Sequence, residues 1–212
     1  MKIKRDFDLS LYVITDDRLS GARSIFDVVR FAIRGGATTI QLRDKSSSEE
    51  ELITIGKELI KITKGDIPLI VNDNINVALA IGAQGTHLGQ KDMPARKAKE
   101  MIGDAMILGV SANTVEEAIK AEEDGADYIG AGPIFSTLTK PDADPAIGLD
   151  GLRNIKKAVS IPVVAIGGIN SANAEEIIKI ADGIAVVSAI MSAKDPKRAA
   201  EELSEIIIRI KK

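Results

Sequence analysis

Short apolar runs alternate with amphipathic segments along the whole chain. The runs are rich in Ile and Val and apolar at consecutive positions, which is typical of strands buried on both faces of a parallel sheet. Eight runs are candidate strands: Leu11–Thr15, Thr38–Leu42, Ile67–Asn72, Gly85–Leu88, Met106–Val110, Asp127–Ala131, Ile161–Ile166 and Ile184–Val187. The intervals between their starts each leave room for one strand and one helix.

Helix start signals lie between these runs. Ser48 with Glu51 three residues later, and Thr114 with Glu117, form the capping-box pattern. Asp195 precedes a proline, which combines a capping side chain with proline at the first helical position. The chain therefore alternates strands with helices.

Eight strand–helix units with no change in composition predict one (β/α)₈ barrel, an α/β TIM barrel that occupies residues 1–212 as a single domain. The alternative is an open doubly wound sheet. That sheet usually has fewer strands, and no GxGxxG motif follows the first predicted strand. One long connection, residues 132–148, follows the sixth predicted strand, and loops of that length in compact domains usually serve function.

Composition excludes several classes of function. The chain of 212 residues has 28 basic and 31 acidic residues, so its charge gives no reason to expect nucleic acid or an anionic membrane as a partner. It has no Cys, which excludes disulfides, thiolate nucleophiles and Cys-ligated metals, and its single histidine, His87, excludes His-pair zinc motifs. No apolar run reaches the roughly 20 residues of a membrane span, and the first eight residues lack a signal-peptide pattern. We therefore expect a cytoplasmic protein.

Polar residues gather where the predicted strands end, which is the active-site end of such a barrel. Gln41, Arg43 and Lys45 have the same parity at the end of the second strand. Two cations and an amide suit a polyanionic substrate, because Arg offers a bidentate fork to phosphate and Lys a mobile charge. The alternative is a salt bridge within the loop, with Asp44 as the partner.

Two carboxylates, Asp73 and Asp92, follow the next two strands. Without His or Cys, such a pair suits Mg²⁺, which takes few protein oxygens and completes its shell with phosphates and water. The alternative is helix capping, because Asp73 precedes a predicted helix. The neighbouring Arg43 and Lys45 favour a metal–diphosphate site.

A second anion site is predicted at the last two strands. Gly167-Gly168 and Val187-Ser188 follow strands seven and eight, where barrels of this class commonly bind phosphate through backbone N–H groups. A tight turn that merely needs glycine is the alternative. Two anion sites at one mouth suit the joining of two phosphorylated compounds with diphosphate as leaving group. His87 is either a general acid or base or, on its buried strand, a structural or supporting residue.

Taken together, these segments resemble the thiamine phosphate synthase family over about residues 11–191. The segments that carry the resemblance are Gln41-Leu42-Arg43-Asp44-Lys45, Val71-Asn72-Asp73, His87-Leu88-Gly89-Gln90-Lys91-Asp92, residues 130–140 (GAGPIFSTLTK) and Val164-Ala165-Ile166-Gly167-Gly168-Ile169. Asp44 stands where many members have Glu, a change of one methylene at the same charge.

The resemblance implies a (β/α)₈ barrel and a transferase of thiamine biosynthesis. In the implied reaction a hydroxymethylpyrimidine diphosphate loses diphosphate, and the nitrogen of a thiazole phosphate attacks the exposed methylene carbon to give thiamine monophosphate. The implied route is dissociative, through a pyrimidine-stabilised carbocation, and depends on Mg²⁺. No general base is needed, which agrees with a chain that has no Cys and one His.

The resemblance also implies roles for individual residues. Arg43 and Lys140 are the implied catalytic residues, and Asp73 and Asp92 the implied Mg²⁺ ligands. The pyrimidine diphosphate is assigned to Gln41, Leu42, Arg43, Asp44, Lys45, Asn72, Ser111 and Lys140. The thiazole phosphate is assigned to Thr137, Leu138, Thr139, Gly168, Val187 and Ser188.

Two alternatives stay open. A thiazole tautomerase of the same barrel family keeps a thiazole phosphate site without the full diphosphate and metal set. The other alternative is a non-catalytic barrel that keeps the fold and acts as a metabolite-binding or regulatory module. The sequence does not decide between plain and carboxylated thiazole phosphate, nor whether the outer helices form a homo-oligomer.

Overall fold

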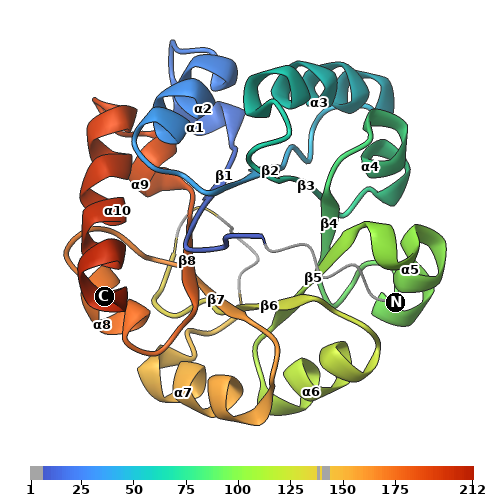
Figure 1. Ribbon diagram of the computed structural model, residues 1–212, viewed down its shortest axis with the longest axis vertical. Helices are drawn as coiled ribbons and strands as arrows, with labels where there is room; N and C mark the ends of the chain where they lie inside the picture. The colour runs from blue at the N-terminus through green and yellow to red at the C-terminus, as the bar shows by residue number, and fades with distance from the viewer. Residues whose placement is uncertain (1–6, 138, 140–143) are drawn as a thin grey trace.

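The chain folds into a closed barrel of eight parallel strands surrounded by helices (Figure 1). The computed structural model describes residues 7–137, 139 and 144–212. Each strand pairs with the next, and β1 pairs with β8, which closes the ring. The strands are β1 (Leu11–Ile14), β2 (Thr39–Leu42), β3 (Leu69–Asn72), β4 (Gly85–Leu88), β5 (Ile107–Ala112), β6 (Tyr128–Ala131), β7 (Val163–Ile166) and β8 (Gly183–Val186).

The closed ring confirms the predicted (β/α)₈ barrel, and the alternative prediction of an open doubly wound sheet is wrong. Two predicted strands, those beginning at Ile67 and Ile161, start two residues later in the structure. Pro68 and Pro162 explain the shift, because proline has no N–H to give to the ladder. Both prolines still accept through their carbonyls, from Ile40 N–H and Ile129 N–H.

The helices form an outer ring around the strands (Figure 1). They are α1 (Asp17–Ser20), α2 (Ile25–Arg34), α3 (Glu49–Thr63), α4 (Ile75–Ile81), α5 (Ala95–Ile102) with a 3₁₀ turn η1 (Gly103–Ala105), α6 (Val115–Glu123), α7 (Gly148–Ala158), α8 (Ala174–Ile178), α9 (Ser188–Met191) and α10 (Pro196–Lys211). None of the described helices is long and apolar enough to cross a membrane.

The predicted start signals act as predicted. The Ser48 side chain accepts from the N–H of Glu51 at the start of α3 while the Glu51 side chain accepts from the Ser48 N–H, and Thr114 and Glu117 repeat this at α6. Asp195 caps α10 by accepting from Arg198 N–H. Each cap satisfies N–H groups that the first helical turn leaves without partners.

The core has two parts, one between the strands and the helices and one inside the barrel. The smaller interior part contains Leu9, Tyr12, Ile14, Ile70, Ile107, Tyr128, Val164 and Ala185. Two tyrosines therefore fill the middle of the barrel, and their hydroxyl groups bring polar atoms among these apolar side chains. Both line the bottom of the cavity at the carboxyl ends of the strands.

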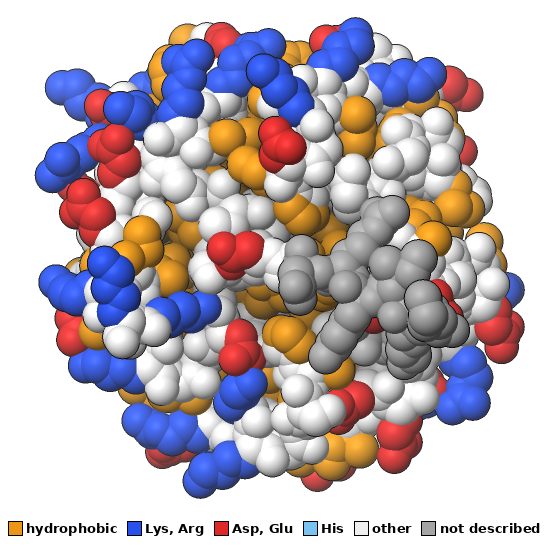
Figure 2. Space-filling view, in the orientation of Figure 1, with side chains coloured by type: hydrophobic (Ala, Val, Ile, Leu, Met, Phe, Trp, Pro, Cys, Tyr) orange, Lys and Arg blue, Asp and Glu red, His pale blue; other side chains and the backbone are white. Residues whose placement is uncertain are grey.

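The surface carries both signs of charge. Lysine, arginine, aspartate and glutamate side chains alternate around the outline of the face in Figure 2. This distribution agrees with the nearly equal counts of basic and acidic residues.

Candidate active site

A cavity of about 250 Å³ opens at the carboxyl ends of the strands. All eight strands or the loops that follow them contribute to its lining. Among the predicted site residues, those that line it are Gln41, Arg43, Lys45, Asn72, Asp73, Asp92, Ser111, Thr137, Thr139, Gly168, Val187 and Ser188. The fold thus brings both predicted anion sites to one cavity.

Four predicted residues are placed differently or not described. Leu42 is buried in the core between strands and helices and does not line the cavity. Asp44 also lies outside the lining and faces its own loop. Leu138 and Lys140 lie outside the described residues.

The cationic side of the cavity is built on β2 and its loop. Arg43 is mostly buried, and its Nη1 lies 4.0 Å from Oδ2 of Asp16 at the end of β1. The same buried carboxylate accepts from Nη2 of the exposed Arg18 at 2.7 Å. Asp16 therefore places a negative charge beside the Arg43 guanidinium, at a distance too long for a hydrogen bond, and this contact was not predicted from the sequence.

The predicted alternative, a salt bridge to Asp44, is wrong. Asp44 accepts from Ser46 and Ser47 in a tight turn. Burial raises the pKa of Asp44, but these hydrogen bonds outweigh it and lower the pKa to about 2. Arg43 and Lys45 each pair with another carboxylate, which leaves Asp44 to shape the loop that carries them.

The two candidate metal ligands lie next to each other at the ends of β3 and β4. Burial and the neighbouring Asp92 raise the pKa of Asp73 to about 6. Lys45 partly offsets this, with its Nζ 3.6 Å from Asp73 Oδ2. Asp92 also accepts from the N–H of Gly89 at 2.7 Å.

Helix capping does not explain these carboxylates. Asn74, not Asp73, caps α4 by accepting from Val77 N–H, and Pro94 precedes α5 with no side-chain cap. Asp73 instead adopts a left-handed backbone conformation with φ 61°, which asparagine and aspartate tolerate best among residues with a side chain.

The donor set fits Mg²⁺. The described residues contain no cluster of three His, Cys, Asp or Glu side chains, so the protein would supply two carboxylates here. Few protein oxygens, with the rest supplied by water and phosphate, is the arrangement that Mg²⁺ prefers. A cation would also relieve the repulsion that raises the pKa of Asp73.

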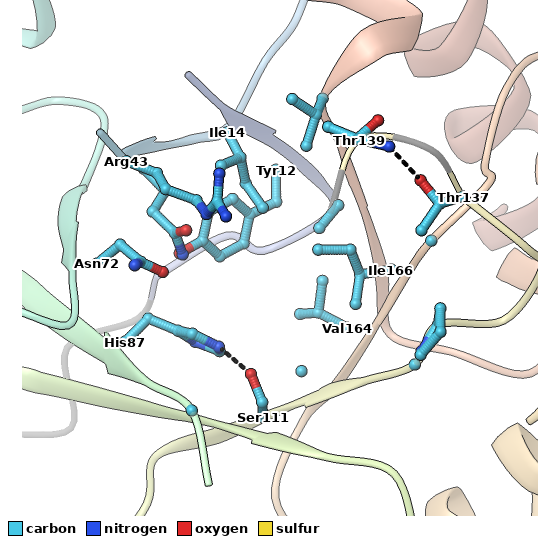
Figure 3. Close-up of a pocket in the computed structure, with 18 of the residues that line it drawn as sticks. Tyr12, Ile14, Arg43, Asn72, His87, Ser111, Thr137, Thr139, Val164 and Ile166 are labelled. Carbon is cyan, nitrogen blue, oxygen red and sulfur yellow. Dashed lines mark hydrogen bonds between the residues drawn. The ribbon is translucent and has the colours of Figure 1, made fainter. Parts of the chain in front are cut away.

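The opposite side of the cavity is formed by backbone and hydroxyl groups from the loops after β6, β7 and β8. Thr137 and Thr139 face each other, and the Thr139 N–H donates to Thr137 Oγ1 at 3.2 Å (Figure 3). Gly168 has φ 67°, and a Cβ there would lie 2.8 Å from Phe135 Cβ, so only glycine fits. The Asn173 side chain holds the Gly168 carbonyl at 2.9 Å.

The floor of the cavity contains His87. Its Nδ1 lies 2.9 Å from the Tyr128 hydroxyl. Its Nε2 lies 2.9 Å from Ser111 Oγ (Figure 3). Burial lowers the pKa of His87 to about 4, although the charge of Asp92 acts in the opposite sense. A neutral ring with both nitrogens hydrogen-bonded supports the prediction of a supporting role over that of a general acid or base.

Three of the lining residues were given no role in the site by the sequence-based prediction. Tyr12 and Tyr128 lie on strands whose pattern indicates only apolar filling, so no signal in the sequence separates them from core residues. Gln90 also lines the cavity, and its Nε2 donates to the Ser111 carbonyl at 2.6 Å. Gln90 follows the end of the predicted strand Gly85–Leu88, and that position could have predicted that it lines the site.

Comparisons with known proteins agree with this geometry. A family model described as thiamine monophosphate synthase matches residues 11–190. A thiamine-phosphate synthase of Chloroflexus aurantiacus is 52% identical over 209 residues, which is 98% of this chain and 96% of the relative. One of Methanocella arvoryzae is 50% identical over 199 residues, 93% of this chain and 94% of the relative.

Solved structures give the same result. A thiamine phosphate pyrophosphorylase from Pyrococcus furiosus has a TM-score of 0.89 and 49% identity, and the match covers 96% of this chain and 97% of that one. A 3-hexulose-6-phosphate synthase with 18% identity and a TM-score of 0.67 shares the fold alone. With one family model spanning most of the sequence and relatives of about half identity along nearly its full length, the chain belongs to the thiamine monophosphate synthase family of enzymes.

Proposed function

We propose that this enzyme condenses 4-amino-5-hydroxymethyl-2-methylpyrimidine diphosphate with 4-methyl-5-(2-phosphoethyl)thiazole or its carboxylate. The products are thiamine monophosphate and diphosphate, and the reaction requires Mg²⁺. The observation that carries the proposal is the single cavity with a cationic, carboxylate-bearing side and a separate side of backbone and hydroxyl groups. Family membership supports the same transfer reaction.

The cationic side suits the diphosphate substrate. Arg43 and Lys45 offer positive charge to its phosphates, and Asn72 and Gln41 offer amides beside them. Asp73 and Asp92 would hold Mg²⁺, which would neutralise charge on the leaving diphosphate. The Asp16 carboxylate, 4.0 Å from Arg43 Nη1, favours a guanidinium that already lies at the cavity wall before the substrate arrives, and preorganised charge of this kind stabilises a leaving group at little reorganisation cost.

The opposite side suits the thiazole phosphate. Thr137 and Thr139 bring hydroxyl groups to the cavity, and Gly168, Val187 and Ser188 bring backbone there. Glycine at 168 permits the left-handed turn, packed against Phe135, that brings this backbone to the cavity. The two substrates would therefore meet over the floor of the barrel, with the thiazole nitrogen facing the methylene carbon.

The cavity suits a dissociative substitution. The C–O bond to the diphosphate breaks first, the pyrimidine ring stabilises the carbocation, and the thiazole nitrogen lone pair forms the new C–N bond. No proton has to leave the nucleophile, so a neutral His87 with both ring nitrogens occupied is compatible with this route. The apolar walls of the cavity, Ile14, Val164 and Ile166, keep water from the cation (Figure 3).

One assay tests the whole proposal. The protein is incubated with both substrates and Mg²⁺, and thiamine monophosphate and diphosphate are measured with and without excess EDTA. We expect equal amounts of both products, and none with EDTA. Full activity in EDTA would overturn the metal requirement. Tight binding of thiazole phosphate with no product would indicate the tautomerase or the metabolite-binding barrel instead.

A further inference from the structure

A chain of hydrogen bonds crosses the interior of the barrel at the floor of the cavity. Gln41 Nε2 lies 2.8 Å from the Tyr12 hydroxyl, which lies 2.9 Å from the Tyr128 hydroxyl. Tyr128 lies 2.9 Å from His87 Nδ1, and His87 Nε2 lies 2.9 Å from Ser111 Oγ. The five side chains come from five strands, β2, β1, β6, β4 and β5. The proposed reaction gives the two tyrosines no role.

The first link fixes a direction for the protons. An amide nitrogen only donates, so Gln41 donates to Tyr12. The Tyr12 side chain is buried, and among the described residues its other polar neighbour is the Tyr128 hydroxyl. A buried hydroxyl proton without an acceptor is costly, so Tyr12 donates to Tyr128.

The same reasoning continues to the cavity. Tyr128 accepts from Tyr12 and therefore gives its own proton to His87 Nδ1. A ring nitrogen that accepts carries no proton, so neutral His87 is protonated at Nε2 and donates to Ser111 Oγ. In the described part of the chain no acceptor takes the Ser111 hydroxyl proton, and Ser111 lines the cavity (Figure 3).

The backbone leaves room for this arrangement at two glycines. A Cβ on Gly109 would lie 2.1 Å from Tyr128 Cζ and 2.5 Å from His87 Nδ1. A Cβ on Gly130 would lie 2.9 Å from His87 Cε1. The rings therefore occupy space that side chains on β5 and β6 would fill. Burial also raises the pKa of both tyrosines, which keeps their hydroxyl groups protonated as donors.

We propose that Tyr12, Tyr128 and His87 are positioning residues that impose one proton order and so present the Ser111 hydroxyl as a donor to the bound substrate. The acceptor is a phosphate oxygen of the diphosphate, which has lone pairs but no proton to give; this part rests on the proposed function. Without a fixed proton order, the Ser111 hydroxyl can face the cavity either as a donor or as an acceptor. Only the donor state suits a phosphate anion, which accepts hydrogen bonds.

The single histidine of the chain makes the proton order measurable. The protein is labelled with ¹⁵N-histidine, and long-range ¹H–¹⁵N correlation spectra are recorded near pH 7.5 without substrate. We expect a protonated Nε2 and an unprotonated Nδ1 in the wild type. A protonated Nδ1, which would make His87 the donor to Tyr128 and Ser111 the donor to His87, would overturn the proposal, as would a mixture of tautomers. The result does not depend on which reaction the enzyme catalyses.

Variants extend the test. Tyr128→Phe removes the acceptor of Tyr12 and the donor to His87, and we expect a mixture of tautomers. Thr86→Val is the matched control. It removes a buried hydroxyl on β4 that donates to the Val71 carbonyl and takes no part in the hydrogen-bond chain. We expect this control to keep the wild-type tautomer. A tautomer shift of equal size in both variants would assign the effect to packing and overturn the proposal.

Kinetics then test the effect on the substrate. We expect Ser111→Ala to lower kcat/KM by about 10- to 100-fold, the range for one charge-assisted hydrogen bond. Tyr128→Phe should lower kcat/KM in the wild type but by less than about twofold in the Ser111→Ala background, since it acts through Ser111. Fully additive losses would make Tyr128 a structural residue only. Absence of any activity in the wild type would refute the proposed function, while the tautomer measurement would still decide the proton order.

Discussion

The Lys45 ammonium lies 3.6 Å from the Asp73 carboxylate, the group that we propose as a Mg²⁺ ligand. The Lys45 side chain is 56% exposed and Asp73 is 31% exposed, so the pair can separate without leaving either charge in an apolar environment. In the free enzyme the lysine competes with a cation for this carboxylate. Once diphosphate is present, its oxygens offer Lys45 a second partner. Metal and diphosphate are therefore expected to bind more tightly together than separately.

Lys45→Met tests this competition. Without substrate, we expect the variant to bind Mg²⁺ about two- to fivefold more tightly, because an exposed ion pair contributes up to about 1 kcal/mol. Its affinity for the diphosphate substrate should fall at the same time. Isothermal titration with Mg²⁺ measures the first effect. Lys91→Met removes an equal charge from the cavity lining and serves as the control. Equal changes in Mg²⁺ affinity in the two variants would show that the loss of one positive charge near the cavity causes the effect, and not the Lys45–Asp73 pair.

Asp73→Asn should raise the stability of the free protein at neutral pH. The folded-state pKa of Asp73 is raised to about 6 from its usual 3.8. Folding therefore favours the protonated form, and the contribution of Asp73 to stability is present below about pH 4 and is lost as the pH rises through 6. We expect the variant to melt on the order of 2 °C higher at pH 7.5 in EDTA, with the difference gone at pH 3.8. Thermal scans at both values check the sign, and a lower Tm for the variant at pH 7.5 would contradict it.

Arg43→Ala should lower kcat/KM strongly. Removal of a preorganised charge-assisted contact to the leaving group costs about 2–4 kcal/mol, or about 30- to 1000-fold. The control is Arg18→Ala, because Arg18 contacts the same Asp16 carboxylate but is 69% exposed and does not line the cavity. We expect less than about threefold loss there. An unchanged kcat/KM in Arg43→Ala would remove this residue from the diphosphate site.

Gly109→Ala should destabilise the barrel from within. The added methyl group would lie 2.1 Å from Tyr128 Cζ, so the ring or the strand has to move. Overpacking of this kind costs about 1–3 kcal/mol. Urea unfolding measures the loss, and we expect the ¹⁵N signals of His87 to shift as its contact with Tyr128 changes. A variant with wild-type stability would show that β5 accommodates a side chain at this position.

The periodicity of the sequence was enough to predict the barrel and the end at which its site lies. Eight apolar runs of strand length leave little choice of topology. Strand parity points Gln41 to the cavity, and Arg43 and Lys45, in the loop that follows β2, also line it. Position by position, the prediction was weaker. Asn74, and not the adjacent Asp73, caps α4, and both residue types are good caps, so the sequence pattern does not separate them.

Side-chain contacts between segments distant in the sequence could not be predicted from residue patterns. The Tyr12 and Tyr128 hydroxyl groups meet across 116 residues of sequence, and either tyrosine read alone is an ordinary core residue. Asp16 was missed for a related reason. An aspartate before a short helix indicates a cap, and it is one, but its second contact with Arg43 exists only because β1 and β2 lie side by side.

The interior hydrogen-bond chain has a consequence for how the barrel assembles. Gln41, Tyr12 and His87 belong to the first four strands, whereas Tyr128 and Ser111 belong to the last four. In a half-barrel that formed alone, the Tyr12 hydroxyl and His87 Nδ1 would face water, and their buried bonds to Tyr128 can form only when the two halves join. Each half is thus incomplete until the other arrives, which favours cooperative folding of the whole ring and disfavours a stable intermediate made of four strands.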